Sequence, residues 1–426
     1  MTKATSKSVR QALADACFRR RSLPPRNRGV WPLYAAAFGM ATALSVLWTA
    51  VPFILRNIGG TEDHVGYAFA ANMLGYLLCL LFAAAKLGHL NPRHTTRRAA
   101  AAMFVATFVM LAAVHQALAH EKFGSPVLIW TVIAAGALAG GAMSLYWPYL
   151  MSWVSADYEG VTLNRRLGTY NGMWSSAAII GPLIGGALAE QSTLAPVGVS
   201  VGALATCFVL LLLAHDESAG NSASSGAVNG PETDYDGRLL LRMKWMARIS
   251  LFCSWLWLSV ARTQFALRFT EIGFSETQFG ILMATFGICN CLTLTGAGRF
   301  GFWHFRPMLL PGVQAAHAVS VLLLVFGSTL WAFVLSFAIT GCAFGLSFSS
   351  HLYYGACGSR NRSKQMAIHE ATISLGVIIG SATAGCLAAN LGAYQPYWFA
   401  IAALAIGLLG QIAVWAALRQ KPNAGN

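Results

Sequence analysis

The chain has 426 residues, of which 56% are hydrophobic and only 10% are charged. Soluble domains carry about 25% charged residues, so this composition excludes a soluble enzyme and indicates a polytopic membrane protein. The formal net charge is +14. The basic residues of the chain lie in short loops between apolar runs rather than on a polar surface. We therefore expect no nucleic acid as a partner.

Twelve apolar runs are long enough to cross a membrane as helices, which takes about 20 residues each. Pro148 and Pro182 interrupt the fourth and fifth runs, as membrane helices tolerate. We expect the spans at 32–55, 66–85, 99–119, 127–154, 167–189, 195–214, 246–267, 277–297, 308–328, 331–354, 366–390 and 396–418.

The distribution of Lys and Arg predicts the orientation. With the N-terminus inside, 25 of the 29 basic residues fall on the cytoplasmic side, three fall outside, and Arg262 lies within a span. Cytoplasmic loops carry an excess of positive charge, so both termini are expected in the cytoplasm.

Two features divide the chain in its middle. The longest loop is rich in Ser, Gly and Asn, which is typical of a flexible linker. Residues 179–189 and 378–388 are identical at six of eleven positions, so span 5 is the counterpart of span 11. Parallel repeats of this kind predict two six-helix bundles related by pseudo-two-fold symmetry in an all-α integral membrane protein. We expect a basic cytoplasmic tail (1–30), an N-terminal bundle (31–214), a cytoplasmic linker (215–245) and a C-terminal bundle (246–420).

A glycine motif lies on span 5. Gly172 is followed eight residues later by Gly181-Pro182-Leu183-Ile184-Gly185-Gly186, which is similar to the antiporter motif G-x8-GP-x2-GG of the major facilitator superfamily. Glycines allow neighbouring helices to approach closely, and proline kinks a helix. With six plus six spans and inside termini, the chain resembles a bacterial branch of that superfamily over about 30–420.

Other motifs of that superfamily are incomplete here. The loop after span 2 contains Gly88, Pro92, Arg93 and Arg97-Arg98, but Pro92 stands where the superfamily's gate has aspartate. The second-half equivalent around Arg299 also lacks an acid, and span 4 contains no arginine. A standard proton-driven drug pump is therefore not indicated. A weaker resemblance, through Trp147-Pro148, Tyr170-Asn171-x-x-Trp174 and His369-Glu370, is to magnetosome-membrane members, which are thought to handle iron.

Glu370 is the candidate coupling residue. An ionisable side chain within a bilayer is costly and by default indicates function. At the repeat offset, His369 and Glu370 match Tyr170 and Asn171, so these residues could line a central site between the repeats. A carboxylate beside an imidazole could also carry a proton. The alternative is an interfacial Glu370 that pairs with Lys364 or caps the helix start.

Arg262 leaves two interpretations open, since it could bind an anionic substrate or extend to the outer headgroups. Other polar and aromatic side chains complete the candidate substrate-binding set, because aromatic faces beside amides suit a sugar ring or an organic cation. These are Asn72, Trp147, Trp174, Asn290, His351 and Tyr354. No two histidines have the spacing of metal ligands on one helix, and we expect no metal site and no cofactor.

The resemblance implies a secondary active transporter that moves a small solute by alternating access, with export or antiport favoured. Sugar or other small-molecule uptake and metal-ion transport of the magnetosome type are alternatives, and so is a sensor or scaffold that does not transport. Nucleotide-hydrolysis and hydrolase motifs are absent from the sequence, so we do not expect an enzyme. The expected partners are a small molecule or ion, the lipid bilayer and a coupling proton. We expect a monomer in the bacterial inner membrane or an intracellular membrane derived from it.

Overall fold

The structure is a computed structural model, and it describes residues 30–84, 90–119, 122–155, 160–214, 237–357, 359 and 362–417. The expected tail and most of the expected linker lie outside these residues. All regular elements within the described part of the chain are helices. This confirms the all-α membrane fold predicted from the sequence.

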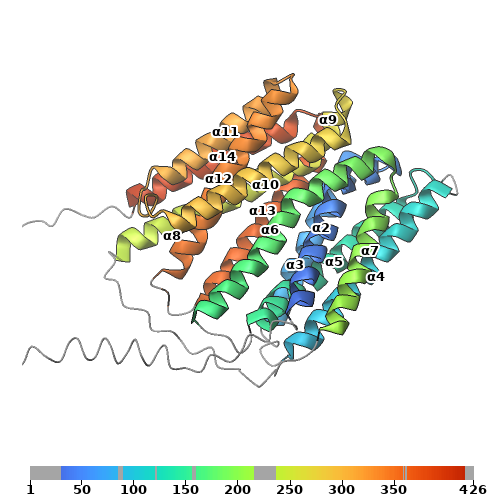
Figure 1. Cartoon of the computed structure of the whole chain (residues 1–426). Helices are drawn as coiled ribbons and strands as arrows, with labels where there is room; N and C mark the ends of the chain where they lie inside the picture. The colour runs from blue at the N-terminus through green and yellow to red at the C-terminus, as the bar shows by residue number, and fades with distance from the viewer. Residues whose placement is uncertain are drawn as a thin grey trace, which may run out of the picture.

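The first six helices form the N-terminal bundle, which we call the N bundle (Figure 1). Each corresponds to one predicted span. Helices α2 to α6 are longer than their spans, whereas α7 is one residue shorter. They are α2 (Trp31–Asn57), α3 (Glu62–Ala84), α4 (Pro92–Ala119), α5 (Pro126–Ser155), α6 (Gly160–Gln191) and α7 (Ala195–Leu213).

The remaining helices form the C bundle. Its first membrane crossing is made of three consecutive pieces, because a π-helical turn, η2, interrupts it. The elements are α8 (Gly237–Val260), η2 (Ala261–Phe265), α9 (Ala266–Glu271), α10 (Glu276–Arg299), α11 (Leu309–Phe326), α12 (Leu330–Ala356), α13 (Arg362–Leu391) and α14 (Gln395–Ala417). Helix α8 begins at Gly237, so residues 237–245 of the expected linker are helical.

Eleven of the described helices are long and apolar enough to span a membrane by themselves. The twelfth crossing, α8–η2–α9, does not satisfy that criterion, since α8 carries four basic residues and ends at the π turn. Four basic residues in the first half of α8 explain why the predicted span started nine residues late. The hydropathy signal begins only where the chain becomes apolar.

Local sequence sets several helix starts. The Asn91 side chain accepts a hydrogen bond from the N–H of Arg93 at 2.9 Å, and Pro92 occupies the first helical position of α4. Asparagine before proline is a favourable helix start. Ser275 and Gln278 form a reciprocal capping box at the start of α10. Pro92, the departure from the superfamily's gate motif, is thus a helix-initiating residue here.

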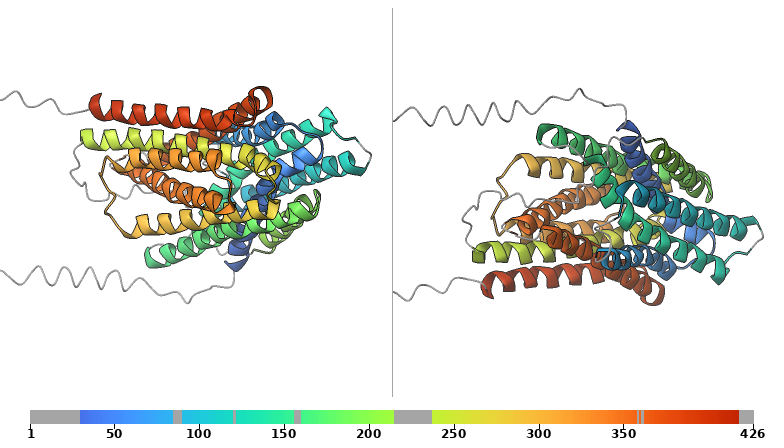
Figure 2. Two further views of the ribbon diagram at one scale, coloured as in Figure 1. Left: turned by 90° about the horizontal axis from the view of Figure 1, so that it is seen from above. Right: turned by 90° about the horizontal axis from the view of Figure 1, so that it is seen from below.

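The two bundles meet along two helix pairs, α3 against α13 and α6 against α10. Figures 1 and 2 show that the bundles lie close together at one end and diverge toward the other. We call the first end the ion-pair end, since Arg56 on α2 and Glu271 on α9 form an ion pair of 2.6 Å there. The other is the terminal end, where α2 begins and α14 ends.

Two glycine crossings close the ion-pair end, and they are related by the pseudo-symmetry. An added Cβ at Gly186 on α6 would lie 3.0 Å from the Cα of Gly280 on α10. The counterpart at Gly385 on α13 would lie 3.1 Å from the Cα of Gly66 on α3. Gly186 and Gly385 are matched positions of the sequence repeat. The helices cross backbone to backbone, which only glycine permits at this separation.

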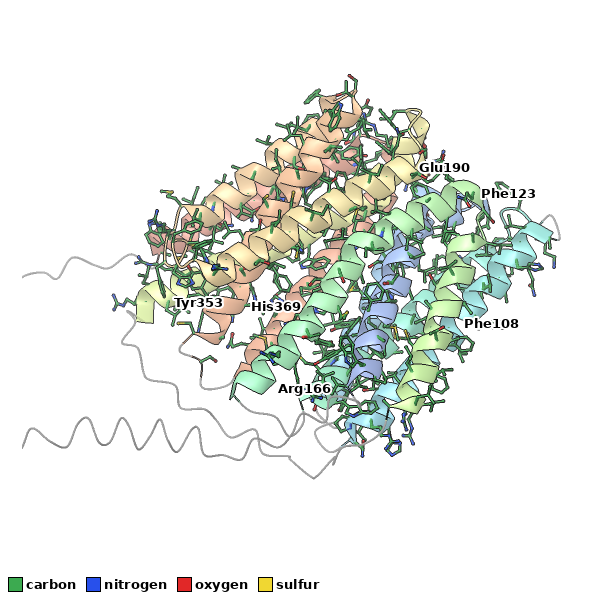
Figure 3. The ribbon with its side chains drawn as sticks, in the orientation of Figure 1. Phe108, Phe123, Arg166, Glu190, Tyr353 and His369 are labelled. Atoms are coloured by element: carbon green, nitrogen blue, oxygen red, sulfur yellow. The ribbon has the colours of Figure 1, made fainter. Side chains whose placement is uncertain are left out.

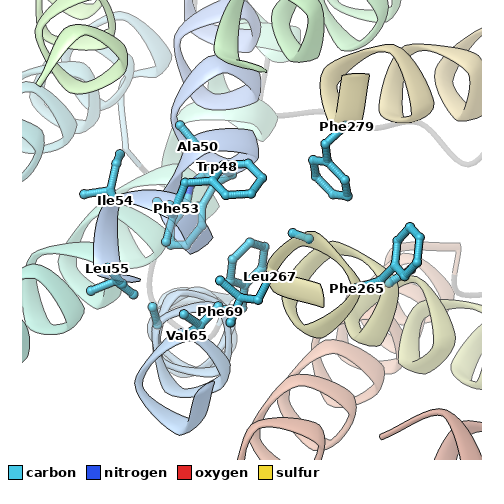
Figure 4. Packing of buried hydrophobic residues seen from close by; sticks show 14 of the residues in the cluster. Trp48, Ala50, Phe53, Ile54, Leu55, Val65, Phe69, Phe265, Leu267 and Phe279 are labelled. Atoms are coloured by element: carbon cyan, nitrogen blue, oxygen red, sulfur yellow. The ribbon is translucent and has the colours of Figure 1, made fainter. Parts of the chain in front are cut away.

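Apolar side chains from both bundles form one continuous core beside these crossings (Figure 4). Phe53 on α2 packs edge-on against Phe279 on α10, with ring centroids 5.6 Å apart. Phe69 on α3 packs edge-on against Trp48 on α2 at 5.0 Å. Gln264 on η2 adds a hydrogen bond across the bundles to the carbonyl oxygen of Glu62. The ion-pair end is therefore sealed by packing as well as by charge.

Charge is distributed unevenly between the two ends. Five of the six acidic residues that the structure describes belong to the ion-pair end: Glu62, Asp63, Glu190, Glu271 and Glu276. The sixth, Glu370, lies within α13. Most described basic residues belong to the terminal end, including Arg93, Arg97, Arg166, Arg242 and Arg299. This distribution agrees with the charge pattern from which the orientation was predicted.

Candidate functional site

The faces of α6 and α10 separate partway along their length. Gly287 on α10 still approaches Ala178 on α6, since an added Cβ would lie 3.0 Å from the Ala178 carbonyl oxygen. Two turns further toward the terminal end, Gly172 has no neighbour within 4 Å of its Cβ position. Asn171 and Trp174 are exposed there, and the Trp174 indole N–H donates to the Asn171 amide oxygen at 3.2 Å. This part of α6 is accessible.

Glu370 connects the two bundles. Its carboxylate accepts a hydrogen bond of 3.0 Å from the hydroxyl of Tyr76 on α3. Helix α13 begins at Arg362, about two turns before Glu370, so Glu370 does not cap the helix start. The side chain is half-buried. Glu370 lies on the terminal-end side of the glycine crossing between α3 and α13. There, the Tyr76–Glu370 hydrogen bond joins the two bundles.

His351 and His369 form a buried pair within the C bundle. Their Nδ1 atoms are 2.9 Å apart, so one ring donates a hydrogen bond to the other. Phe348 packs edge-on against His369 with ring centroids 4.7 Å apart. Figure 3 places His369 on α13 beside the diverging parts of the bundles. Histidines from separate helices thus meet, which spacing along one helix could not predict.

Arg262 on η2 contacts the N bundle. Its guanidinium carbon is 5.8 Å from the ring centroid of Phe69 on α3. The side chain is half-buried, whereas the other four residues of the π turn are buried. Since Phe69 belongs to α3, the guanidinium is directed toward the N bundle, and its role in binding an anion stays a prediction.

Three of the expected substrate-binding residues lie inside a bundle. Asn72 is 4% exposed and donates to the carbonyl oxygen of Gly136, so it joins α3 to α5. Tyr170 is 4% exposed and belongs to the apolar core of the N bundle, against which Trp147 also packs. These contacts correct the prediction that Asn72 and Tyr170 face the centre.

Two C-bundle residues of the expected set also have local roles. The amide oxygen of Asn290 on α10 faces Gly345 on α12, within the bundle. The Tyr354 hydroxyl accepts a hydrogen bond of 2.7 Å from the N–H of Phe305, whose φ is +55°. Tyr354 thus orders the loop between α10 and α11. In the same loop, His304 stacks on Tyr353, and burial lowers the pKa of His304.

The span-5 motif supplies helix contacts on two sides. Added Cβ atoms at Gly181 and Gly185 would meet Ser45 and Val46 on α2. On its other side, the motif contacts α10 through Gly186 and Pro182. An added Cβ at Gly280 on α10 would lie 2.5 Å from the carbonyl oxygen of Pro182. Gly172, the first glycine of the motif, makes no such contact.

The gate motif after span 2 is only partly described, since Gly88 lies outside the described residues. Arg97 donates to the carbonyl oxygens of Leu211, Leu212 and Ala214, and so caps the end of α7. Arg299, the expected equivalent in the second half, is the exposed last residue of α10.

Sequence reasoning missed Tyr76, Gly66 and Gly280. One signal for the glycines was present, since α3 and α10 both begin with glutamate followed four residues later by glycine. Tyr76 carries no such signal, because its partner is 294 residues away. Within the described residues, no group of three His, Cys, Asp or Glu side chains is positioned to hold a metal ion.

Two helical bundles that are joined at one end, with polar residues where they diverge, define a membrane transporter of the twelve-helix type. A sequence profile described as Major Facilitator Superfamily matches residues 33–350 and 249–426. The chain belongs to the Major Facilitator Superfamily, as its span-5 motif predicted.

One relative is "Multidrug resistance protein MdtG" of Serratia proteamaculans (strain 568), which is 25% identical over 193 residues. That match spans 44% of this chain and 44% of the relative, so the chain aligns with less than half of that protein.

Several solved structures share the fold. A bacterial homologue of the iron transporter ferroportin, in an inward-facing state, has a TM-score of 0.70 at 14% identity, covering 91% of this chain and 99% of that one. The nucleoside transporter NupG has a TM-score of 0.66 at 14% identity, covering 92% and 100%. An inward-facing bacterial homologue of the human lysosomal transporter Spinster has a TM-score of 0.65 at 15% identity, covering 94% and 100%. At these identities the likeness shows the fold alone.

Proposed function

We propose that the protein is a secondary transporter that exports a small solute by alternating access. The two bundles rock about the interface formed by α3, α6, α10 and α13. The basic terminal end lies in the cytoplasm, in keeping with the positive-inside rule. In this orientation, the closed ion-pair end and the diverging terminal end make the arrangement an inward-facing one. Export is supported by the antiporter-type motif on α6 and by the similarity to a multidrug resistance protein.

The hydrogen bond between Tyr76 and Glu370 carries the proposal. Glu370 is the one acidic side chain that the described helices bring into the interior, and its partner belongs to the other bundle. A carboxylate that gains or loses a proton at this point changes the strength of a contact that joins the two bundles. Glu370 therefore couples proton transfer to the relative movement of the bundles.

Reconstituted vesicles test this coupling. The full chain is placed in proteoliposomes containing a pH-sensitive dye, and radiolabelled sugars, organic cations, organic anions and divalent metals are added in turn, so that proton and solute movement are both measured. Three proteins are compared: wild type, Glu370→Gln and the control Glu276→Gln, which neutralises a carboxylate at the ion-pair end. We expect one solute class to move protons in wild type and in Glu276→Gln. Glu370→Gln, which keeps an acceptor for Tyr76, should exchange solute without moving protons.

The two failures are distinguishable. If Glu370→Gln moves protons at the wild-type rate, the coupling role is wrong while transport stands. If folded wild-type protein moves no solute of any class, the transporter proposal fails and a sensor or scaffold function is favoured.

A further inference from the structure

The π turn η2 presents one charged side chain to the interface between the bundles. Helix α8 ends at Val260, and the turn occupies Ala261–Phe265 before α9 continues. Arg262 is the half-buried residue of the turn and the other four are buried. Single π turns within helices are rare and are frequently found at functional sites. The turn therefore places a guanidinium where an uninterrupted helix would direct it differently.

Arg262 has no counter-charge among the residues that the structure describes. Its contact is with the aromatic ring of Phe69, and no hydrogen bond or ion pair of its guanidinium to a described residue is found. Arg268, on the same membrane crossing, differs. Its guanidinium donates to the carbonyl oxygen of Val325 and lies 4.0 Å from the ring centroid of Tyr394.

Glu370, the acidic side chain of the interior, lies too far away to neutralise Arg262. Ser259, one turn before Arg262, packs against Gly380 on α13. Glu370 precedes Gly380 by ten residues, which is about 15 Å along the helix. In addition, Glu370 already accepts the Tyr76 hydrogen bond. An uncompensated charge within a membrane protein is costly, so its retention indicates an anion that arrives from outside the chain.

Contacts on the ion-pair side of Arg262 leave the terminal end as the direction from which an anion would approach. Beyond Arg262, Gln264 bonds to the carbonyl oxygen of Glu62 and the glycine crossings bring the helices together. Arg262 thus lies at the closed end of an interface that diverges in the other direction. A guanidinium offers five N–H donors in a planar fork, which matches a carboxylate or phosphate group.

We propose that Arg262 binds the anionic group of the transported solute, and that this solute is a small organic anion with a carboxylate or phosphate group. This inference rests on the proposed transport function. The solute's negative charge pairs with Arg262 at the closed end of the interface. Glu370 remains separate from it, toward the terminal end.

Isosteric probes that differ only in charge test the substrate class. Benzoate and its neutral counterpart benzamide, together with inorganic phosphate, are titrated calorimetrically into the full chain in phosphatidylcholine vesicles. Phosphatidylcholine carries no net charge, so no lipid with a net negative charge competes for the guanidinium. We expect an anion to bind more tightly than benzamide. The Arg262→Gln variant should weaken that anion's binding roughly tenfold to hundredfold, because a charged hydrogen-bond partner is lost. Arg262→Lys should retain part of the affinity.

Lys122→Gln is the matched control, because Lys122 is an exposed cation at the ion-pair end. It should bind the anion as wild type does. Thermal unfolding without ligand separates binding from folding, since removing an unpaired interior charge should leave Arg262→Gln at least as stable as wild type. A variant that unfolds earlier than wild type contradicts the absence of a partner for Arg262.

Three results overturn the proposal. One is that benzamide binds as tightly as every anion, another is that Arg262→Gln leaves anion binding unchanged, and a third is that Lys122→Gln weakens it equally. If the proteoliposomes transport a neutral or cationic solute and Arg262→Gln has no effect on it, transport stands and this inference fails. If benzoate binds through Arg262 but no solute crosses the membrane, the anion site stands and transport fails.

Discussion

Closure of the ion-pair end depends on the glycine crossings, so an added methyl group there should open it. In Gly186→Ala, the new Cβ would collide with the carbonyl oxygen of Glu276 and lie 3.0 Å from the Cα of Gly280. Ordinary contact begins near 3.4 Å, so α6 and α10 must move apart, and overpacking of this kind costs about 1–3 kcal/mol. That penalty applies when the ion-pair end is closed and is relieved when it opens. The open population should therefore rise about 5- to 150-fold.

Native Cys386 provides the readout for this change. Its Sγ lies 3.0 Å from the Tyr67 hydroxyl across the interface, and the side chain is half-buried. The rate of maleimide labelling at Cys386, followed by mass spectrometry on purified protein, reports how often the two bundles part there. We expect labelling of Gly186→Ala to be about 5- to 150-fold faster than that of wild type, because the open population rises by that factor.

A second glycine separates this effect from helix propensity. Gly202 on α7 has no atom within 4 Å of its Cβ position, so Gly202→Ala adds the same methyl group without a clash. Both substitutions favour helix by about 1 kcal/mol. Equal Cys386 labelling rates in Gly186→Ala, Gly202→Ala and wild type would refute the assignment of the crossing as the closure point.

Further substitutions test the local contacts. Arg97→Gln removes a cap from the carbonyl oxygens at the end of α7, and it should lower the free energy of unfolding by about 1–2 kcal/mol in thermal or denaturant unfolding. Unchanged stability would contradict that role. Tyr354→Phe leaves the N–H of Phe305 without its acceptor, so amide hydrogen exchange in the α10–α11 loop should accelerate; protection equal to wild type would argue against it. Arg56→Gln breaks the exposed pair with Glu271, which should cost under about 1 kcal/mol, and a larger loss of stability would mean that the pair carries more of the closure than packing does.

Helix positions followed from the sequence because the bilayer imposes a length and an apolar composition on each span. The largest difference is at the start of α8. Helix α8 begins at Gly237, nine residues before its predicted span, because its basic first half continues as helix without being apolar. The π turn at Ala261 also leaves no trace in hydropathy, and it decides where Arg262 points.

The direction in which each side chain points was harder to predict. A helix that is apolar all round has no periodic pattern to show which face meets which neighbour. Asn72 and Tyr170 were therefore assigned to the centre, although they pack inside the N bundle. Glu370 could be singled out because a carboxylate within a span is costly. Its partner Tyr76 could not, since only the assembled fold brings α3 and α13 together.

The symmetric crossings show what repeat analysis could and could not supply. Gly186 and Gly385 occupy matched positions in the two aligned segments, so their equivalence was readable from the sequence. Their contact partners, Gly66 and Gly280, lie outside those segments, and only the structure identifies them. A repeat thus predicts that two positions are equivalent, while the fold shows that both are points of closure.

Distances between the two bundles at both ends test the central claim most directly. Spin labels at Arg165 and Arg299 report on the terminal end, and labels at Lys122 and Ala393 report on the ion-pair end; all four positions are exposed. Pulsed electron resonance on the full chain is compared with and without the Gly186→Ala change. Alternating access predicts that the distance at the ion-pair end lengthens while the distance at the terminal end shortens. Two distances that stay fixed, or that lengthen together, would contradict a rocking movement of the bundles.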